Sequence, residues 1–139
     1  MNKKMRISFA GCGFMGVYHI GVGHCLYERV PDLVDNLEGF YGTSAGAIMA
    51  VCMACGTKTK DGNLFVTKAT DMVHKSYLGA FGPQFNPSAL IEEFLESTMP
   101  EDAHRFMRNV VEISMTELPS MKSKRITDFN TRKEVIKVR

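Results

Sequence analysis

The sequence has 139 residues, 45% of them hydrophobic and 23% charged, which is ordinary for one globular domain. A net charge of +2 gives no general case for a nucleic-acid partner, and no run of about 18 apolar residues predicts a membrane span. Four cysteines lie in apolar surroundings without a secretion signal, so we expect reduced thiols in an intracellular protein. Cys52 and Cys55 lack the partner spacing of a zinc site, and we expect neither a metal nor a cofactor.

The first half of the chain is predicted to contain two strands and two helices. Residues 5–10 have the alternating pattern of a short strand, and a helix is expected over residues 16–29. A proline ends that helix, and a short helical turn leads to a second strand around residues 40–41. The apolar run over residues 45–55 then predicts a buried helix, with Gly56 as its C-terminal cap.

The second half is predicted to be mostly helical, with one further pair of strands. Residues 61–79 place apolar side chains at helical spacing, which predicts an amphipathic helix ended by Gly79. Asn86 and Pro87 are typical of a helix start, and that helix is expected to run through Glu96. The remaining predicted elements are a short helix over 100–108, strands over 111–116 and 124–127, and a final helix opened by a capping box at 131–134. The segment 121–139 carries seven basic and two acidic side chains, which we interpret as a solvated face, with weak contact to anionic lipid as the alternative.

A Gly-x-Ser-x-Gly pattern, Gly42-Thr43-Ser44-Ala45-Gly46, lies between the second strand and the buried helix. A strand, a sharp turn and a helix are the context of a nucleophile elbow. Glycines on both sides of the serine remove collisions with the main chain and permit a positive φ where one is needed. Ser44 would then stand at the first turn of a helix, whose free N–H groups favour developing negative charge. We therefore predict that Ser44 is a nucleophile; the alternative is a small-residue turn that lets a helix pack closely on a sheet.

A second glycine motif, Gly11-Cys12-Gly13-Phe14-Met15-Gly16, directly follows the first strand. Its glycine spacing matches the dinucleotide-binding fingerprint, but that interpretation requires an acidic residue at the tip of the second strand. Asp32 and Asp35 instead precede that strand. We favour an oxyanion hole: if the two strands are parallel neighbours, this loop can aim main-chain N–H groups, with Gly13 and Phe14 as candidate donors, at a carbonyl held over Ser44. Nucleotide binding remains the alternative.

A nucleophilic serine needs a base, and the sequence places none beside Ser44. None of the four histidines (His19, His24, His74, His104) has a setting that points it at the serine. We interpret the first two, on the glycine-flanked helix, as packed or surface side chains. The only Asp-Gly pair begins at Asp61, at the end of the elbow helix that is far from the serine.

The two glycine motifs, together with Phe-Asn-Pro-Ser at 85–88 and Thr-Asp-Phe at 127–129, resemble the patatin-like phospholipase family. The similarity runs from about Ile7 to the end of the chain and is nearest to the branch of adipose triglyceride lipase and adiponutrin. It implies a three-layer α/β/α sandwich and hydrolysis of acyl esters in triacylglycerol or phospholipid by a serine–aspartate dyad without histidine. It also implies that Ser44 is the nucleophile and that Gly11, Gly13 and Gly16 shape the oxyanion loop.

The family's aspartate lies in an Asp-Gly-Gly or Asp-Gly-Ala turn, and no residue of this chain matches it, because Asp61 comes too early. We therefore expect residues 5–139 to be the N-terminal portion of a truncated patatin-like phospholipase domain, a fragment or partial gene model with little turnover of its own. The expected partners are a triacylglycerol or phospholipid substrate, a lipid-droplet or membrane surface, and a protein co-activator. The expected location is the cytoplasm, peripheral on lipid droplets or membranes. The alternative is a catalytically inactive lipid-droplet or regulatory protein that binds lipid with the same fold.

Overall fold

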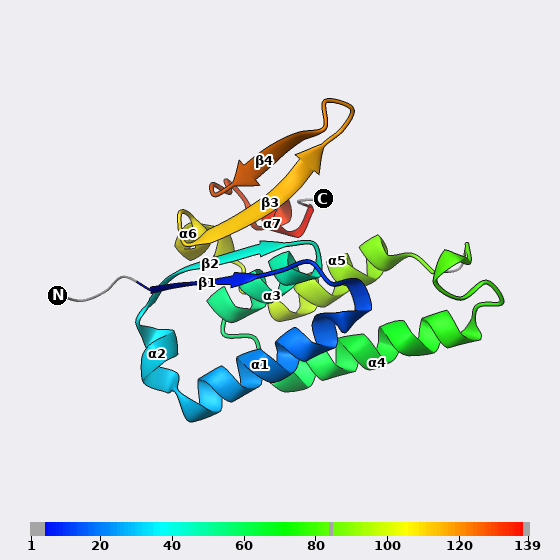
Figure 1. The fold of residues 1–139 in the computed structure, drawn as a ribbon, viewed down its shortest axis with the longest axis horizontal. Coiled ribbons are helices and arrows are strands. Elements are labelled where there is room, and N and C mark those ends of the chain that lie inside the picture. Colours follow the sequence, from blue (N-terminus) through cyan, green and yellow to red (C-terminus); the bar gives the residue numbers. More distant parts are fainter. Residues whose placement is uncertain (1–4, 84, 138–139) are drawn as a thin grey trace.

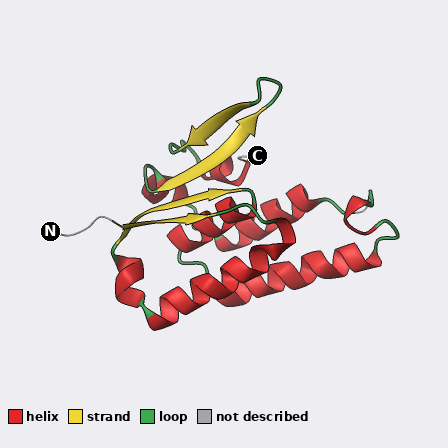
Figure 2. Ribbon diagram, in the orientation of Figure 1, coloured by secondary structure: helices red, strands yellow, loops and turns green. Residues whose placement is uncertain are grey.

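The computed structural model describes residues 5–83 and 85–137 as a mixed α/β fold (Figure 1; Figure 2). The elements are, in chain order, β1 (Met5–Phe9), the 3-10 turn η1 (Gly13–Met15), α1 (Gly16–Arg29), α2 (Pro31–Asp35), β2 (Leu37–Thr43), α3 (Ala45–Ala54), α4 (Thr59–Lys75), the 3-10 turn η2 (Gly79–Phe81), α5 (Pro87–Thr98), α6 (Ala103–Met107), β3 (Val111–Glu117), β4 (Lys122–Ile126) and α7 (Arg132–Lys137). Within the described part of the chain, no helix is long and apolar enough to cross a bilayer.

The described strands form a four-stranded sheet in the order β1-β2-β3-β4. The pairs β1–β2 and β2–β3 are parallel, whereas β4 runs antiparallel to β3. Phe9, the last residue of β1, is paired with Gly42, which lies one residue before the end of β2. The carboxyl ends of β1 and β2 therefore lie side by side, and the two loops that leave them start from neighbouring positions.

Helix α3 is the central helix of the fold and packs on β1, β2 and β3 as well as on α1. Its sequence is apolar on every side, which is typical of a helix enclosed by other elements. Helices α1 and α4 run beside each other, and in Figure 1 they lie on the same side of β1 and β2 as α3 and α5. The hairpin of β3 and β4 extends away from this helical layer (Figure 1).

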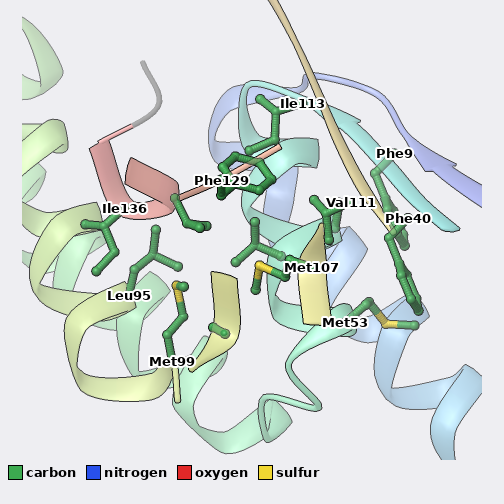
Figure 3. Close-up of a cluster of buried hydrophobic side chains, with 14 of the residues drawn as sticks. Phe9, Phe40, Met53, Leu95, Met99, Met107, Val111, Ile113, Phe129 and Ile136 are labelled. Carbon is green, nitrogen blue, oxygen red and sulfur yellow. The ribbon is translucent and has the colours of Figure 1, made fainter. Parts of the chain in front are cut away.

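The core lies between one face of the sheet and the helices (Figure 3). On that face the strands contribute Phe9, Phe40, Val111 and Ile113, which follow the alternation of a half-buried strand. The helices and the segment before α7 complete the core with, among others, Val51, Met53, Leu95, Met99, Met107, Phe129 and Ile136.

The other face of the sheet is more polar. It carries Arg6, whose guanidinium lies 5.8 Å from the centre of the Tyr41 ring, and Glu112, which pairs with Arg125 at 3.7 Å. Parallel strands joined through helices that pack on the sheet confirm the predicted α/β class and are consistent with a truncated α/β/α sandwich.

Most predicted elements are present, with shifts at their ends. Helix α1 has the predicted bounds, and the Asn86 side chain accepts the Ala89 N–H at 3.1 Å, as expected of an N-cap. Helix α4 ends at Lys75 instead of Gly79, because Ser76 already has an extended backbone. The short helix begins at Ala103 rather than Pro100, since residues 101–102 form a turn.

The last strand and the last helix also differ from prediction. Strand β4 begins at Lys122, two residues early, because Lys122 pairs with Glu117 at the end of β3. At α7 the Glu134 N–H donates to the Thr131 hydroxyl at 3.2 Å, as a capping box requires. The Glu134 carboxylate, however, accepts the N–H of Asn130 at 2.7 Å, one residue before the one predicted.

Candidate active site

Ser44 stands alone at the bend between β2 and α3. Its backbone has φ 53° and ψ −127°, a left-handed φ that side-chain-bearing residues adopt at a cost of about 1–3 kcal/mol. The side chain is exposed and makes no capping hydrogen bond to α3. Its carbonyl accepts the Ala47 N–H at 2.9 Å, which starts the helix directly after the bend. The hydroxyl is thus presented at the surface by a strained, well-supported turn.

The glycines on either side of the bend are required by close main-chain contacts. A Cβ at Gly42 would collide with the carbonyl group of Gly46 and lie 2.6 Å from the Ala47 nitrogen. A Cβ at Gly46 would lie 2.6 Å from the carbonyl carbon of Phe9 and 2.7 Å from the carbonyl oxygen of Ala10. Real Cβ atoms essentially never approach closer than 3.0 Å, so the predicted collisions are confirmed. The positive φ, however, falls on Ser44 and not on either glycine.

The glycine loop after β1 lies against the serine bend. A Cβ at Gly11 would be 3.1 Å from the Ser44 Cβ and 3.2 Å from the Thr43 carbonyl oxygen. At the other end of the loop, a Cβ at Gly16 would be 3.3 Å from the Ala45 Cβ. The two motifs predicted to lie at neighbouring strand tips are therefore in direct contact.

The middle of the glycine loop has the features of a main-chain anion site. Gly13 has φ +54° and nothing within 4 Å of the place where a Cβ would be. Gly13 and Phe14 open the turn η1, and N–H groups at the start of a helical turn have no partner within it. Both residues line the same cavity as Ser44. The exposed Phe14 ring lies 5.9 Å from the Phe85 ring, and Met15 beside it is exposed too.

That cavity has a volume of about 590 Å³ and a mainly apolar lining supplied chiefly by α1, α3, α4 and α5. It extends from Ser44, before α3, to Met53 near the other end of that helix. Ten residues of helix correspond to a length of about 15 Å. A volume in the range of about 300–1,000 Å³ is typical of pockets for small molecules.

The end of the cavity far from Ser44 carries groups whose pKa values favour their neutral forms. Burial raises the pKa of the Cys52 thiol to about 12, and Cys55 behind it adds to that shift. The pKa of Tyr27 is also raised, first by burial, and its hydroxyl donates to the Met53 carbonyl at 2.6 Å. Near neutral pH these groups add no charge to the apolar lining.

The structure separates most of the remaining candidates from the serine. Asp32 and Asp35 lie on α2, ahead of the strand, as predicted. Asp61 lines a second hollow between α4 and α5, beside the ion pair of Lys68 and Glu93. His24 Nε2 lies 3.4 Å from a Glu28 carboxylate oxygen, one turn along α1.

His19 is the residue whose position the sequence did not indicate. Its Nε2 atom lies 2.9 Å from the Ala10 carbonyl oxygen and 3.3 Å from the Cys12 sulfur, so it contacts the glycine loop itself. The only available signal was its place one turn after Gly16, the first residue of α1.

Comparisons with known proteins agree with this geometry. The family description "Patatin-like phospholipase" matches residues 7–138. Patatin-like phospholipase domain-containing protein 2 of Homo sapiens is 37% identical over 134 residues, which are 96% of this chain and 27% of that protein. The 1-acylglycerol-3-phosphate O-acyltransferase Pnpla3 of Mus musculus is 32% identical, over 96% of this chain and 32% of that protein. Patatin-like phospholipase domain-containing protein 4 of Homo sapiens is 31% identical, over 98% of this chain and 54% of that protein.

The chain spans between about a quarter and about half of the length of these relatives. No solved structure shows a significant match. A family match over nearly the whole chain, with both glycine motifs joined at one site, settles the assignment. The chain belongs to the patatin-like phospholipase family.

Proposed function

We propose that Ser44 is the nucleophile of a lipid acyl-ester hydrolase that acts on triacylglycerol or phospholipid. One observation carries the proposal: an exposed serine at a strained bend is in contact with a glycine loop, in a chain of the patatin-like phospholipase family. A turn that served only close packing would not need a left-handed serine at its tip, because glycine adopts that conformation without strain.

The chemistry follows from the arrangement of the two loops. The Ser44 oxygen attacks the ester carbonyl carbon while its proton passes to a base, and the carbonyl oxygen becomes an oxyanion. The N–H groups of Gly13 and Phe14 hold that oxyanion, and each such donor contributes about 3 kcal/mol to the transition state. The bond to the alcohol then breaks, the alcohol takes the proton, and water hydrolyses the acyl-enzyme. By resemblance to the family the base is an aspartate, which no residue of this chain matches.

The apolar cavity supports an acyl chain as the group that is bound. Ser44 and residues along α3 as far as Met53 line it, a length of about 15 Å, so a chain attached to the reacting carbonyl can lie along it. Its mainly apolar lining favours an uncharged hydrocarbon tail.

A second candidate activity is acyl transfer. Two relatives are named 1-acylglycerol-3-phosphate O-acyltransferase, and they match 94–96% of this chain. Transfer would use the same acyl-enzyme, with a lipid hydroxyl in place of water as the acceptor. Product analysis with labelled acyl donor, with and without an acceptor lipid, separates free fatty acid from a new ester.

We also propose that the protein works at a lipid-droplet or membrane surface reached from the cytoplasm, where a protein co-activator can join it. The tip of the β3–β4 hairpin exposes Leu118 and Met121, with side chains 75% and 70% accessible. The adjoining strand exposes Lys122, Lys124 and Arg125, which suit an anionic surface, although Lys124 and Arg125 also pair with Glu117 and Glu112 at 3.7 Å. Imaging of a tagged protein tests the location: an even cytosolic distribution in lipid-loaded cells would count against it.

A fluorophosphonate probe tests the proposal most directly. The protein expressed from its complete gene should be labelled at Ser44, as identified by peptide mass spectrometry, and Ser44→Ala should abolish labelling. Ser123→Ala, which removes an exposed hydroxyl on β4, is the matched control and should label normally. Lipid binding without any labelling would favour the inactive lipid-binding alternative. The isolated 139-residue chain should show little turnover, and turnover at ordinary lipase rates would show that no outside base is needed.

A further inference from the structure

We propose that His19 is a positioning residue that holds the glycine loop in its working orientation beside Ser44. The proposal rests on the proposed function and adds a residue that none of the predicted roles included. Its basis is the contact of one imidazole with the residues on both sides of Gly11.

The contacts of His19 show that its Nε2 atom acts as a hydrogen-bond donor. The Ala10 carbonyl oxygen can only accept a hydrogen bond, so Nε2 of His19, 2.9 Å away, carries the hydrogen. The same Nε2 atom also lies 3.3 Å from the Cys12 sulfur. The ring packs edge-on against Phe9, with 5.4 Å between centroids and 68° between planes. Packing and hydrogen bonding together fix the ring on the first turns of α1.

The hydrogen bond to Ala10 controls the next residue of the loop because a peptide unit is planar. The Ala10 carbonyl and the Gly11 N–H belong to one plane and point in opposite directions, so fixing the carbonyl fixes the N–H. Gly11 lacks a Cβ, and its neighbouring peptide units rotate more freely than those of other residues. Without a partner for the Ala10 carbonyl, the peptide between Ala10 and Gly11 can turn and carry the loop with it.

The same carbonyl also lies against the helix that follows Ser44. A Cβ at Gly46 would be 2.7 Å from the Ala10 oxygen, and a Cβ at Gly11 would be 3.1 Å from the Ser44 Cβ. His19 on α1 thus holds a carbonyl of the glycine loop that itself lies against the start of α3. A shift of about 1 Å in such an arrangement can change a catalytic rate by about a hundredfold.

Two variants separate hydrogen bonding from packing. His19→Leu keeps an apolar side chain against Phe9 but has no donor, whereas His19→Gln retains an N–H donor near the position of Nε2. In the protein expressed from its complete gene, we expect His19→Leu to lower kcat and the rate of fluorophosphonate labelling about 10- to 100-fold, with KM within about twofold. We expect His19→Gln to recover most of that loss. The control His74→Leu changes an exposed histidine near the end of α4 and should leave kcat, KM and the labelling rate unchanged.

The outcomes distinguish this inference from the proposed function. No labelling of Ser44 in the unaltered protein would overturn the proposed function. Normal labelling and turnover in His19→Leu, or equal losses in the Leu and Gln variants, would overturn the role of His19 alone. If His19→Leu does not fold, amide hydrogen exchange over residues 10–16 in the Gln variant decides: protection as in the unaltered protein supports the tether, and lost protection contradicts it.

Discussion

The contact between Gly46 and the end of β1 makes a quantitative prediction about Gly46→Ala. The new Cβ would lie 2.6 Å from the Phe9 carbonyl carbon, although carbon atoms pack at about 3.5–4.0 Å. Either α3 or the tip of β1 must therefore move by about 1 Å. Alanine has no rotamer that relieves the overlap, and the nearest atoms all belong to the main chain of Phe9 and Ala10.

The size of the effect follows from two opposing contributions. Overpacking in a well-packed region costs about 1–3 kcal/mol, and contact with main chain places Gly46→Ala near the upper value. Replacing a helical glycine by alanine contributes at most about 1 kcal/mol in the other direction. We therefore expect a net destabilisation of about 2 kcal/mol. For a domain of this length that corresponds to a fall in Tm of roughly 6–10 °C.

Gly21→Ala provides the matched control, because Gly21 is an exposed position on α1 with nothing within 4 Å of its added Cβ. Here only the helix propensity changes, and Tm should rise by roughly 3–5 °C. Thermal unfolding of the unaltered protein, Gly46→Ala and Gly21→Ala, followed by circular dichroism at one pH and concentration, measures both shifts in Tm. An unchanged or higher Tm for Gly46→Ala would refute the inferred close packing of the elbow on β1.

Four further measurements test other parts of the structure. Ser44→Gly should raise the stability by about 1 kcal/mol, because glycine relieves the positive φ, and a lower Tm would contradict the strain. Iodoacetamide at pH 8 should alkylate the exposed Cys25 well before Cys52 and Cys55, whose pKa values are raised to about 12, and equal rates would contradict their burial. The same two thiols keep their protons in the folded state, so the fold should lose stability as pH rises from the ordinary value of 9.0 toward about 12. Asn86→Ala should cost about 1 kcal/mol by removing the cap of α5, and a Tm shift below about 1 °C would argue against that cap.

The parts of the fold that were predictable are those encoded by neighbouring residues. Helix α1 was placed correctly because its limits are a glycine motif and a proline, and the start of α5 because Asn86 and Pro87 are a strong local start signal. The end of α4 and the start of β4 were wrong by a few residues. Their limits depend on the extended Ser76 and on pairing with β3, which no local pattern records.

The same division holds for the candidate site. The contact between the two glycine motifs was predictable, since two parallel strands that are neighbours end at the same edge of a sheet. The 590 Å³ cavity was not, because it forms between helices that are distant in sequence. The tether from His19 was missed for a similar reason: a histidine on a glycine-flanked helix has no pattern that reveals its side-chain partner.

The pairing of Phe9 with Gly42 has one more consequence. Adjacent strands are held at about 4.8 Å by their main-chain ladder, whatever side chains they carry. The geometry of the peptide backbone therefore sets the separation between Ser44 and the glycine loop. Substitutions elsewhere in the two loops change the orientation of the loops more readily than the distance between them. The cavity lining from α4 and α5 can consequently vary while the serine and the glycine loop keep a constant spacing.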